Sequence, residues 1–251
     1  MILKPNYIVT RDESHIYTID TGDNKVVVPG TTGILDIVGS KDKTNRLMGW
    51  AKKNCLLKVA EHIRAFSGKP LNVDEAWIEA VRKSAWKRDK DMLKDAGDIG
   101  TRCHAAIDAY IEGREPILDE QTTQGYNNFL AWLKDAGIKL IAGDTFVGSL
   151  SMRYGGALDA LGEKDGEMVL LDWKTSNYLK DENSLQAAAY AMAAEETFSG
   201  LKISRAFVVR FGKEIVGDIE PKEVNLNPAK NAFKCALELH DAMTAPIWRQ
   251  I

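Results

Sequence analysis

Alternating apolar and polar positions identify two strands near the middle of the chain. Residues 156–161 and 168–175 each follow this alternation. The segment between them contains Lys164-Asp165-Gly166, and an Asp-Gly pair between two alternating segments is typical of a tight hairpin turn. The pattern therefore predicts a β-hairpin, followed by a helix that begins near Asn183.

The same reading of the rest of the chain predicts further strands, including a small hairpin layer at the N-terminus with a turn at residues 21–24. Besides the central hairpin, the expected strands are 7–9, 16–19, 25–28, 143–147, 205–211 and 214–219. The last of these is expected to pair with the strand before it.

Apolar residues at helical spacing predict the helices. Besides the helix near Asn183, the expected helices cover residues 44–65, 99–113, 122–136 and 228–243, and another begins near Asn72, between the first two of these. Asn72 is expected to start that helix through a capping box with Glu75, and Gly97-Asp98 to separate it from the next. Gly137 is expected to end the helix before it, because glycine is the usual helix C-terminal cap.

Two carboxylates stand on the strands of the predicted hairpin. Because side chains alternate along a strand, Asp159 has apolar neighbours on its face, and Asp172 shares a face with Leu170 and Lys174. An unpaired charge among apolar side chains is costly, so these groups need compensation. Either they form an ion pair on a surface hairpin, or they bind a divalent metal.

The metal interpretation gives each of these groups a chemical role. Magnesium prefers oxygen ligands, which Asp159 and Asp172 supply, and the carbonyl of Trp173 is close enough in sequence to add another. Lys174 would point at the attacking water, where its charge would orient the water and stabilise hydroxide beside the metal. The pattern is thus compatible with metal-assisted phosphodiester hydrolysis.

The flanking residues add to this pattern. Gly155 and Gly156 remove side chains where the first strand enters the site, as expected where another chain segment or a ligand comes close. Gln186 and Tyr190 lie four residues apart on the next helix and so share a face. They offer an amide and a phenol to a phosphate group.

Taken together, G-G-x-L-D at 155–159, D-W-K-T at 172–175 and Q-x-x-x-Y at 186–190 resemble the PD-(D/E)XK nucleases, specifically the RecB-like exonuclease branch. The pattern is also similar to the phage-encoded and mitochondrial single-strand exonucleases of that branch. The resemblance implies an α/β fold with a restriction-endonuclease-like core, in which helices flank a mixed central sheet. The segment at 28–39 is similar to the start of phage relatives, and no site is predicted there.

The resemblance also implies a metal site. Here His104, within G-T-x-x-H, joins Asp159 and Asp172 in holding one or two Mg²⁺ or Mn²⁺ ions. On its own, a histidine beside an apolar helix stripe is more often a hydrogen-bonded structural residue. Relatives often carry glutamate where this chain has Asp144, which is one methylene shorter. Both a metal role and a structural role stay open for Asp144.

The family roles carried over to the substrate side concern Lys174, Gln186, Tyr190 and Thr175. Lys174 positions the nucleophilic water, Gln186 and Tyr190 steady the scissile strand, and the Thr175 hydroxyl contacts phosphate. Hydrolysis would then proceed by in-line attack with no covalent enzyme intermediate.

Composition bounds these expectations. A chain of 251 residues with 45% hydrophobic content can bury the core of one domain. We expect N-terminal strands at 1–40, a helical, DNA-binding region at 41–96, and the catalytic core at 97–251. The net charge of −3 gives no global basic field, so nucleic acid would be recognised by local patches.

Cysteine usage and hydropathy address the compartment. Cys55, Cys103 and Cys235 are widely spaced and odd in number, which argues against a disulfide framework. The absence of a membrane-length apolar run or a signal-peptide pattern predicts a soluble protein. We therefore expect the cytoplasm of a bacterium or of a phage-infected host cell.

The 41–96 region combines tryptophan with many basic residues, which suits a single nucleic-acid strand. Its basic residues are Lys41, Lys43, Arg46, Lys52, Lys53, Lys58, Arg82, Lys83, Lys87, Arg88 and Lys90. Solvated helix faces with tryptophans in the core would explain the same composition at least as well.

Three functions remain open. The favoured one is a metal-dependent DNA exonuclease acting on single strands or DNA ends in recombination, repair or replication, with a protein of those processes as a candidate partner. The second is a structure-specific DNA endonuclease with the same acids. The third is a non-catalytic nucleic-acid-binding module. Strand polarity, DNA or RNA preference and oligomeric state stay open.

Overall fold

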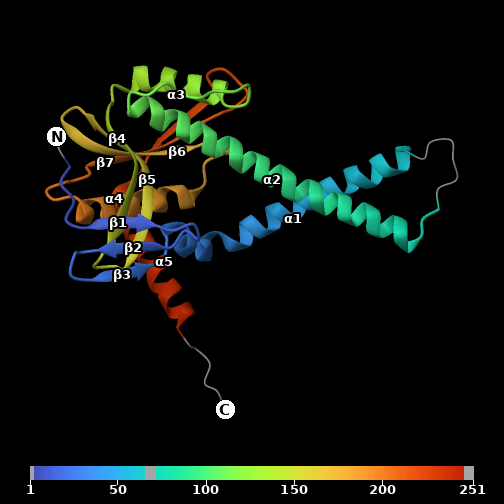
Figure 1. Cartoon of the computed structure of the whole chain (residues 1–251), viewed down its shortest axis with the longest axis horizontal. Coiled ribbons are helices and arrows are strands. Elements are labelled where there is room, and N and C mark those ends of the chain that lie inside the picture. Colours follow the sequence, from blue (N-terminus) through green and yellow to red (C-terminus); the bar gives the residue numbers. More distant parts are fainter. Residues whose placement is uncertain (1–2, 66–71, 246–251) are drawn as a thin grey trace, which may run out of the picture. The chain divides into compact units, whose positions relative to one another are not determined.

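The computed structural model describes residues 3–65 and 72–245, with the backbone alone for residues 39–46 (Figure 1). The chain divides into two compact units, Met1–Val38 with Gly100–Ile251, and Gly39–Ile99. Helices α1 (Thr31–Ala65) and α2 (Glu75–Ile111) contribute residues to both units. Within the described ranges, none of the helices combines the length and apolar character needed to cross a bilayer.

A five-stranded mixed sheet forms the centre of the first unit (Figure 1). Its strands, in spatial order, are β4 (Lys139–Ser149), β5 (Tyr154–Lys164), β6 (Glu167–Lys174), β7 (Arg205–Phe211) and β8 (Ile219–Glu223). β6 and β7 are parallel, and the other neighbours are antiparallel. Parallel neighbours need a crossover, which contains α4 (Asp181–Thr197). The predicted mixed α/β fold is confirmed.

The central hairpin is also confirmed. β5 and β6 are joined by a tight turn in which Asp165 and Gly166 have φ angles of 54° and 80°. Positive φ at both central residues belongs to the turn type that matches the twist of paired strands. An Asp-Gly pair tolerates this backbone, which explains why the turn could be predicted.

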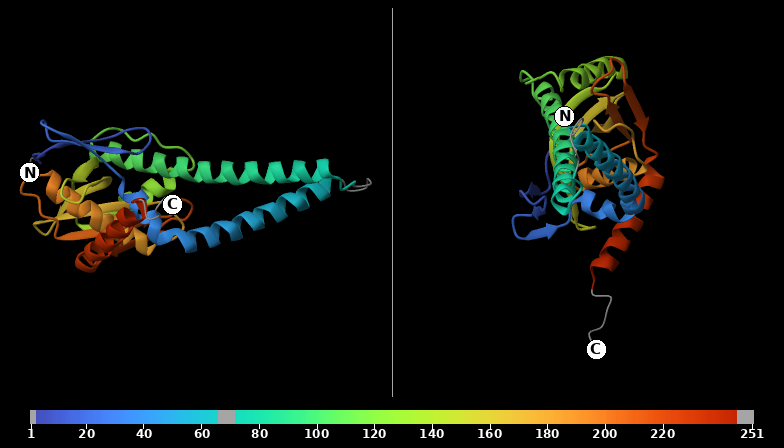
Figure 2. Two further views of the ribbon diagram at one scale, coloured as in Figure 1. Left: turned by 90° about the horizontal axis from the view of Figure 1, so that it is seen from below. Right: turned by 90° about the vertical axis from the view of Figure 1, so that its right-hand side faces the viewer.

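Helices cover both faces of the sheet (Figure 2). α4 packs on the sheet and against α5 (Leu226–Thr244). Its alanines from Ala187 to Ala194 are almost completely buried, as in a helix enclosed on all sides. α3 (Thr123–Ala136) packs against β7 and β8, and its C-terminal Gly137 has the expected left-handed backbone.

An aromatic cluster joins α3 to the sheet on the face opposite α4. Phe129 and Trp132 of α3 contact Trp173 of β6 and Phe211 of β7, with ring centroids 5.6–6.0 Å apart. Such pairs contribute about 0.5–1.5 kcal/mol each beyond their buried area. Because the Trp173 side chain is held on this face, Asp172 and Lys174 on the same strand point to the other.

The predicted N-terminal layer is present as a three-stranded antiparallel sheet. Its strands are β1 (Ile8–Arg11), β2 (Tyr17–Asp20) and β3 (Lys25–Val28). The layer contacts β4 and β5, and Gly155 N donates to Pro29 O over 2.9 Å. A Cβ on Gly155 would lie 2.6 Å from Tyr17, so the absence of a side chain there allows this close approach.

Three predicted helix boundaries were wrong. α1 begins at Thr31 rather than near Thr44, because Ile34 and Leu35 are buried in the core beside α4. α2 is one helix rather than two, because a glycine inside a helix, here Gly97, lowers helix stability by only about 1 kcal/mol and does not have to end it. Asp74, not Asn72, caps its start, since Trp77 N donates to Asp74 Oδ1 over 2.8 Å.

The position of the last strand was also wrong. β8 does pair with β7, but it begins at Ile219 rather than Glu214. The intervening loop is held by buried Asn128, whose amide donates to Gly212 O and Ile215 O. Gly217 N donates back to its oxygen. These tertiary contacts hold the segment as a loop.

Gly156→Ala should destabilise the fold, because an added Cβ would lie 2.3 Å from Tyr190 Cε1. Overpacking of this kind costs about 1–3 kcal/mol, and a lower urea midpoint should show it. Gly33→Ala in α1 is the matched control, since its Cβ would meet nothing within 4 Å. The control should be neutral or stabilising by up to about 1 kcal/mol. A Gly156→Ala midpoint at the wild-type value would contradict the predicted contact.

Candidate active site

The site lies where β5 separates from β6. The two strands pair from Lys164 and Glu167 as far as Ala160 and Leu171, and β6 then stays paired with β7 alone. Asp159 and Asp172 directly follow the last pair. The fork therefore brings the two predicted carboxylates to one place at the end of the shared ladder.

At this fork the Asp159 carboxylate accepts a backbone hydrogen bond that a paired strand would otherwise accept. Trp173 N donates to Asp159 Oδ2 over 2.7 Å, and His104 Nδ1 donates to Oδ1 over 3.2 Å. Burial alone would raise the pKa of Asp159, but His104, Lys174 and the Trp173 amide outweigh it and lower that pKa. Likewise, burial would lower the pKa of His104, and the Asp159 carboxylate reverses this and raises it.

Asp172 is the most buried charged group of the site, with 2% of its side chain exposed. Its Oδ2 forms an ion pair with Lys174 Nζ, but no described donor makes a hydrogen bond of good geometry to this oxygen. Burial raises the pKa of Asp172 above its usual value, and the charge of Lys174 offsets this only in part. For Lys174, the two carboxylates overcome burial and raise the pKa.

These groups line a cavity of about 980 Å³ within the first unit. The predicted residues that line it are His104, Asp144, Asp159, Asp172, Lys174, Gln186 and Tyr190. Trp173 and Thr175 are not among its lining residues. The Trp173 side chain lies in the aromatic cluster, while the Thr175 hydroxyl packs beside Gly100, where a Cβ would approach to 2.9 Å.

Gln186 and Tyr190 of α4 form one wall of the cavity. Gln186 Nε2 donates to Tyr190 Oη over 2.8 Å and reaches Thr32 Oγ1 at 3.4 Å. Burial raises the pKa of Tyr190 well above its usual value, so the phenol stays protonated. The pair thus presents neutral hydrogen-bonding groups beside the carboxylates.

The N-terminal segment contributes lining residues that the sequence did not predict. Arg11, His15 and Tyr17 come from β1, β2 and their turn, and Thr31 and Thr32 from the start of α1. The first amides of a helix carry partial positive charge and favour anions. The similarity of segment 28–39 to phage relatives was the one signal that could have identified this wall.

Two further acids, Asp108 and Asp144, line the same cavity. The β4–β5 register places Asp144 between residues that pair with the neighbours of Asp159, and its φ of 26° is unusual for a non-glycine residue. Burial and then the charge of Asp144 raise the pKa of Asp108 to about 6. Asp108 was not predicted, although it lies one helical turn after His104.

The donor set fits a hard divalent cation. Asp159 and Asp172 offer carboxylate oxygens, and the buried Asp172 Oδ2 has the Lys174 ammonium against it but no hydrogen bond of good geometry from the described residues. Among residues 3–65 and 72–245, no three His, Cys, Asp or Glu side chains form a ready-made metal cluster. Magnesium commonly uses only one or two carboxylates and completes its shell with water and phosphate oxygens.

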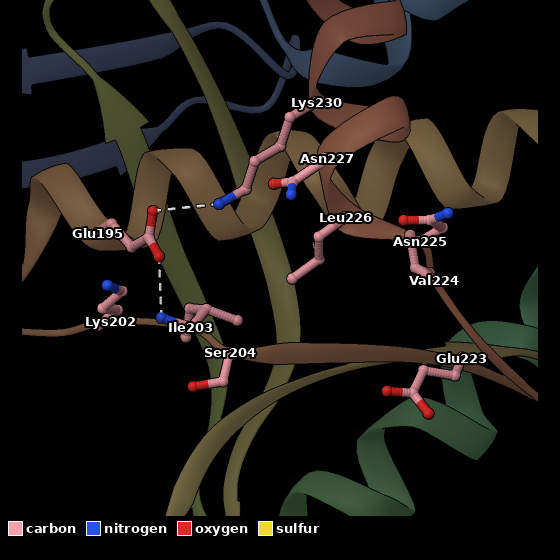
Figure 3. A pocket seen from close by; sticks show the side chains of 10 residues that line it. All are labelled: Glu195, Lys202, Ile203, Ser204, Glu223, Val224, Asn225, Leu226, Asn227 and Lys230. Atoms are coloured by element: carbon pink, nitrogen blue, oxygen red, sulfur yellow. Dashed lines mark hydrogen bonds and ion pairs between the residues drawn. The ribbon is translucent and has the colours of Figure 1, made fainter.

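A second cavity, of about 720 Å³, is formed around the start of α5 and the residues that precede β7 (Figure 3). Among its lining residues, Glu195 pairs with Lys230 at 3.3 Å and accepts a hydrogen bond from Ile203 N. None of the predicted site residues lines this cavity. We therefore assign the chemistry to the cavity at the β5–β6 fork.

Comparisons with known proteins add independent findings. A family model described as the PD-(D/E)XK nuclease superfamily matches residues 64–248. A search of curated proteins returned no match.

Among solved structures, an alkaline exonuclease (LHK-Exo) from Laribacter hongkongensis is similar at 13% identity, with a TM-score of 0.37, over 53% of this chain and 73% of that chain. SSO0001 is similar at 12% identity, with a TM-score of 0.32, over 49% of this chain and 59% of that chain.

Proposed function

Because the chain belongs to the PD-(D/E)XK nuclease superfamily and is therefore a nuclease, we propose that it is a metal-dependent DNA exonuclease acting on single strands or DNA ends. The observation that carries the proposal is the fork of β5 and β6, where Asp159, Asp172 and Lys174 line one cavity. The exonuclease mode rests on the resemblance of the motifs to the RecB-like branch.

Nucleases of this superfamily generally use divalent metal ions. In this chain, Asp159, Asp172 and the Trp173 carbonyl, with His104, would hold one or two Mg²⁺ or Mn²⁺ ions. A bound ion would supply Lewis acidity, which favours ionisation of a bound water and offsets the charge of the phosphate. On binding the ion, Asp159 and His104 would exchange their mutual hydrogen bond for bonds to the metal, since carboxylate and neutral imidazole are both common metal ligands.

Lys174 acts on the attacking water. Its ammonium lies against Asp172 and stays charged, so it donates hydrogen bonds and stabilises negative charge on the water oxygen. The water oxygen gives up a proton to solvent and forms a bond to phosphorus while the bond to the leaving oxygen breaks on the opposite side. The leaving oxygen takes up a proton from solvent, and no covalent enzyme intermediate forms.

The other walls of the cavity hold the substrate strand. The start of α1, with Thr31 and Thr32, favours a phosphate through its amides, and Arg11 adds a full positive charge. Gln186 and Tyr190, on the α4 wall, donate hydrogen bonds from uncharged groups. Together these groups fix the phosphate without adding to the negative charge of the carboxylates.

The exonuclease mode predicts dependence on a free end. With Mg²⁺, the protein should degrade end-labelled linear single-stranded DNA and leave a circular single strand of the same sequence intact. A preparation that linearises the circle would instead identify the second candidate, an endonuclease with the same acids. Double-stranded linear and circular DNA measured in parallel would separate a preference for ends from a preference for single strands.

Asp172→Asn and Lys174→Gln should each reduce cleavage by about 10²–10³-fold or more, because each removes a group that stabilises charge in the transition state. The matched controls are Asp165→Asn in the exposed hairpin turn and Lys222→Gln on β8, which should keep wild-type rates. Circular dichroism and the thermal midpoint verify folding. Wild-type rates in a folded Asp172→Asn or Lys174→Gln variant would refute the mechanism.

Metal dependence is expected in both binding and activity. EDTA should stop cleavage, and added Mg²⁺ or Mn²⁺ should restore it. Titration calorimetry with Mn²⁺ should detect binding to the wild type, weakened at least about tenfold in Asp159→Asn, since a charged ligand is replaced by a neutral one. Cleavage that persists after complete chelation would contradict the proposed chemistry.

A further inference from the structure

The second unit, Gly39–Ile99, exposes a tryptophan on one face of α2. Trp86 is 64% exposed, whereas Val81 and Ala85 on the same helix are buried. At 100° per residue, Trp86 lies about 140° around the helix from Val81. Trp77 is on the packed side, where its ring meets His62 of α1 edge to face at 6.4 Å. Trp86 therefore does not fit the alternative in which the tryptophans of this region lie in the core and its basic residues only form solvated helix faces.

Positive charge surrounds this ring. Arg82, Lys83, Lys87 and Lys90 recur at helical spacing around Trp86 and, with Asp91, line a shallow cavity of about 410 Å³. We call this set the Trp86 surface. The whole chain has a net charge of −3, so the local excess of basic residues is not a general property of the protein.

The basic groups differ in how far they are already paired. Arg82 and Lys83 form ion pairs with Glu79 at 2.6 and 3.6 Å. Lys90 Nζ lies 5.7 Å from the centroid of the Trp86 ring. In the described chain, Lys87 has no side-chain partner. Lys87 and Lys90 are thus the cations that a ligand can reach without breaking an ion pair.

An exposed aromatic ring in a cavity lined by cations suits one class of ligand. Bases of single-stranded nucleic acid stack on exposed aromatic rings while lysines contact the flanking phosphates. A base-paired duplex offers the phosphates but keeps its base faces stacked. A membrane surface would call for a broader apolar stripe than the single ring found here.

We propose that the Trp86 surface binds single-stranded DNA, with a base stacked on Trp86 and phosphates at Lys87 and Lys90. The choice of DNA rests on the proposed nuclease function. The Trp86 surface contributes affinity for the substrate strand, and bond cleavage is assigned to the carboxylates at the β5–β6 fork.

The test measures binding separately from cleavage. Fluorescence anisotropy of a labelled oligo(dT) 20-mer in EDTA gives the Kd of the 251-residue chain without turnover. Trp86→Ala should weaken binding about tenfold, and Trp86→Phe, which keeps an aromatic face, should lose less. The double variant Lys87→Gln/Lys90→Gln should lower the slope of log K against log salt by about 0.7 for each phosphate that it no longer neutralises.

Controls separate the Trp86 surface from general effects. Lys234→Gln, at an exposed position of α5, matches the lysine changes and should leave Kd unchanged, and Leu56→Ala matches the removal of an exposed apolar group. Thermal midpoints should stay near wild type, since Trp86 is exposed. The Trp86→Ala change should weaken binding of a base-paired 20-mer less than it weakens binding of oligo(dT).

The outcomes distinguish the two proposals. Unchanged oligo(dT) affinity in Trp86→Ala overturns the inference, whether or not the protein cleaves DNA. An equal loss for duplex and single strand overturns the stacking assignment, and would be the result if the surface served only as a charge patch. Selective loss of single-strand binding supports the inference even if the wild type shows no cleavage, in which case the proposed function fails alone.

Discussion

The hydrogen bond from Trp173 N to Asp159 Oδ2 is the contact on which the site depends. Where β5 leaves β6, the amide of Trp173 loses the strand partner that would otherwise accept its hydrogen bond, and a buried amide without an acceptor is costly. The Asp159 carboxylate supplies that acceptor, so the separation of the strands and the orientation of the acid are fixed together. Its second oxygen is left for His104, which comes from a different element. A backbone requirement of the sheet thus places a carboxylate at the edge of a cavity, with one oxygen directed towards other ligands.

The electrostatics of the charged groups at the fork indicate a functional role rather than a stabilising one. Asp159, Asp172, His104 and Lys174 share a small, largely buried volume, where each charge loses contact with water and is offset mainly by the others. A well-packed apolar cluster would be at least as stable, so the set is poorly explained as a stabilising device. Asp172 shows this most clearly, because burial raises its pKa even with Lys174 in contact. A divalent cation at the fork would favour the ionised form of both acids.

Sequence patterns predicted the parts of the fold that depend on local interactions. The Asp165-Gly166 turn, the alternation in β5 and β6 and the glycine end of α3 are each determined by neighbouring residues, and they were predicted correctly. The start of α1 and the loop before β8 depend on burial beside α4 and on Asn128, which no local pattern contains. The same limit applies to the site. Acids on the hairpin could be identified, whereas Arg11, Thr32 and Asp108 reach the cavity only through tertiary packing.

Close contacts explain how these segments, distant in sequence, pack against the hairpin. A side chain at Gly155 would collide with Tyr17, and one at Gly156 with Tyr190, so two successive glycines admit the N-terminal layer and the α4 wall to the same stretch of β5. This proximity matters because acids that bind a metal also repel a phosphate. In a chain with a net charge of −3, attraction has to come from groups placed locally. Arg11 and the start of α1 supply it beside the carboxylates only because the glycines let them approach, and so the packing of β5 determines whether the cavity can accept a polyanion at all.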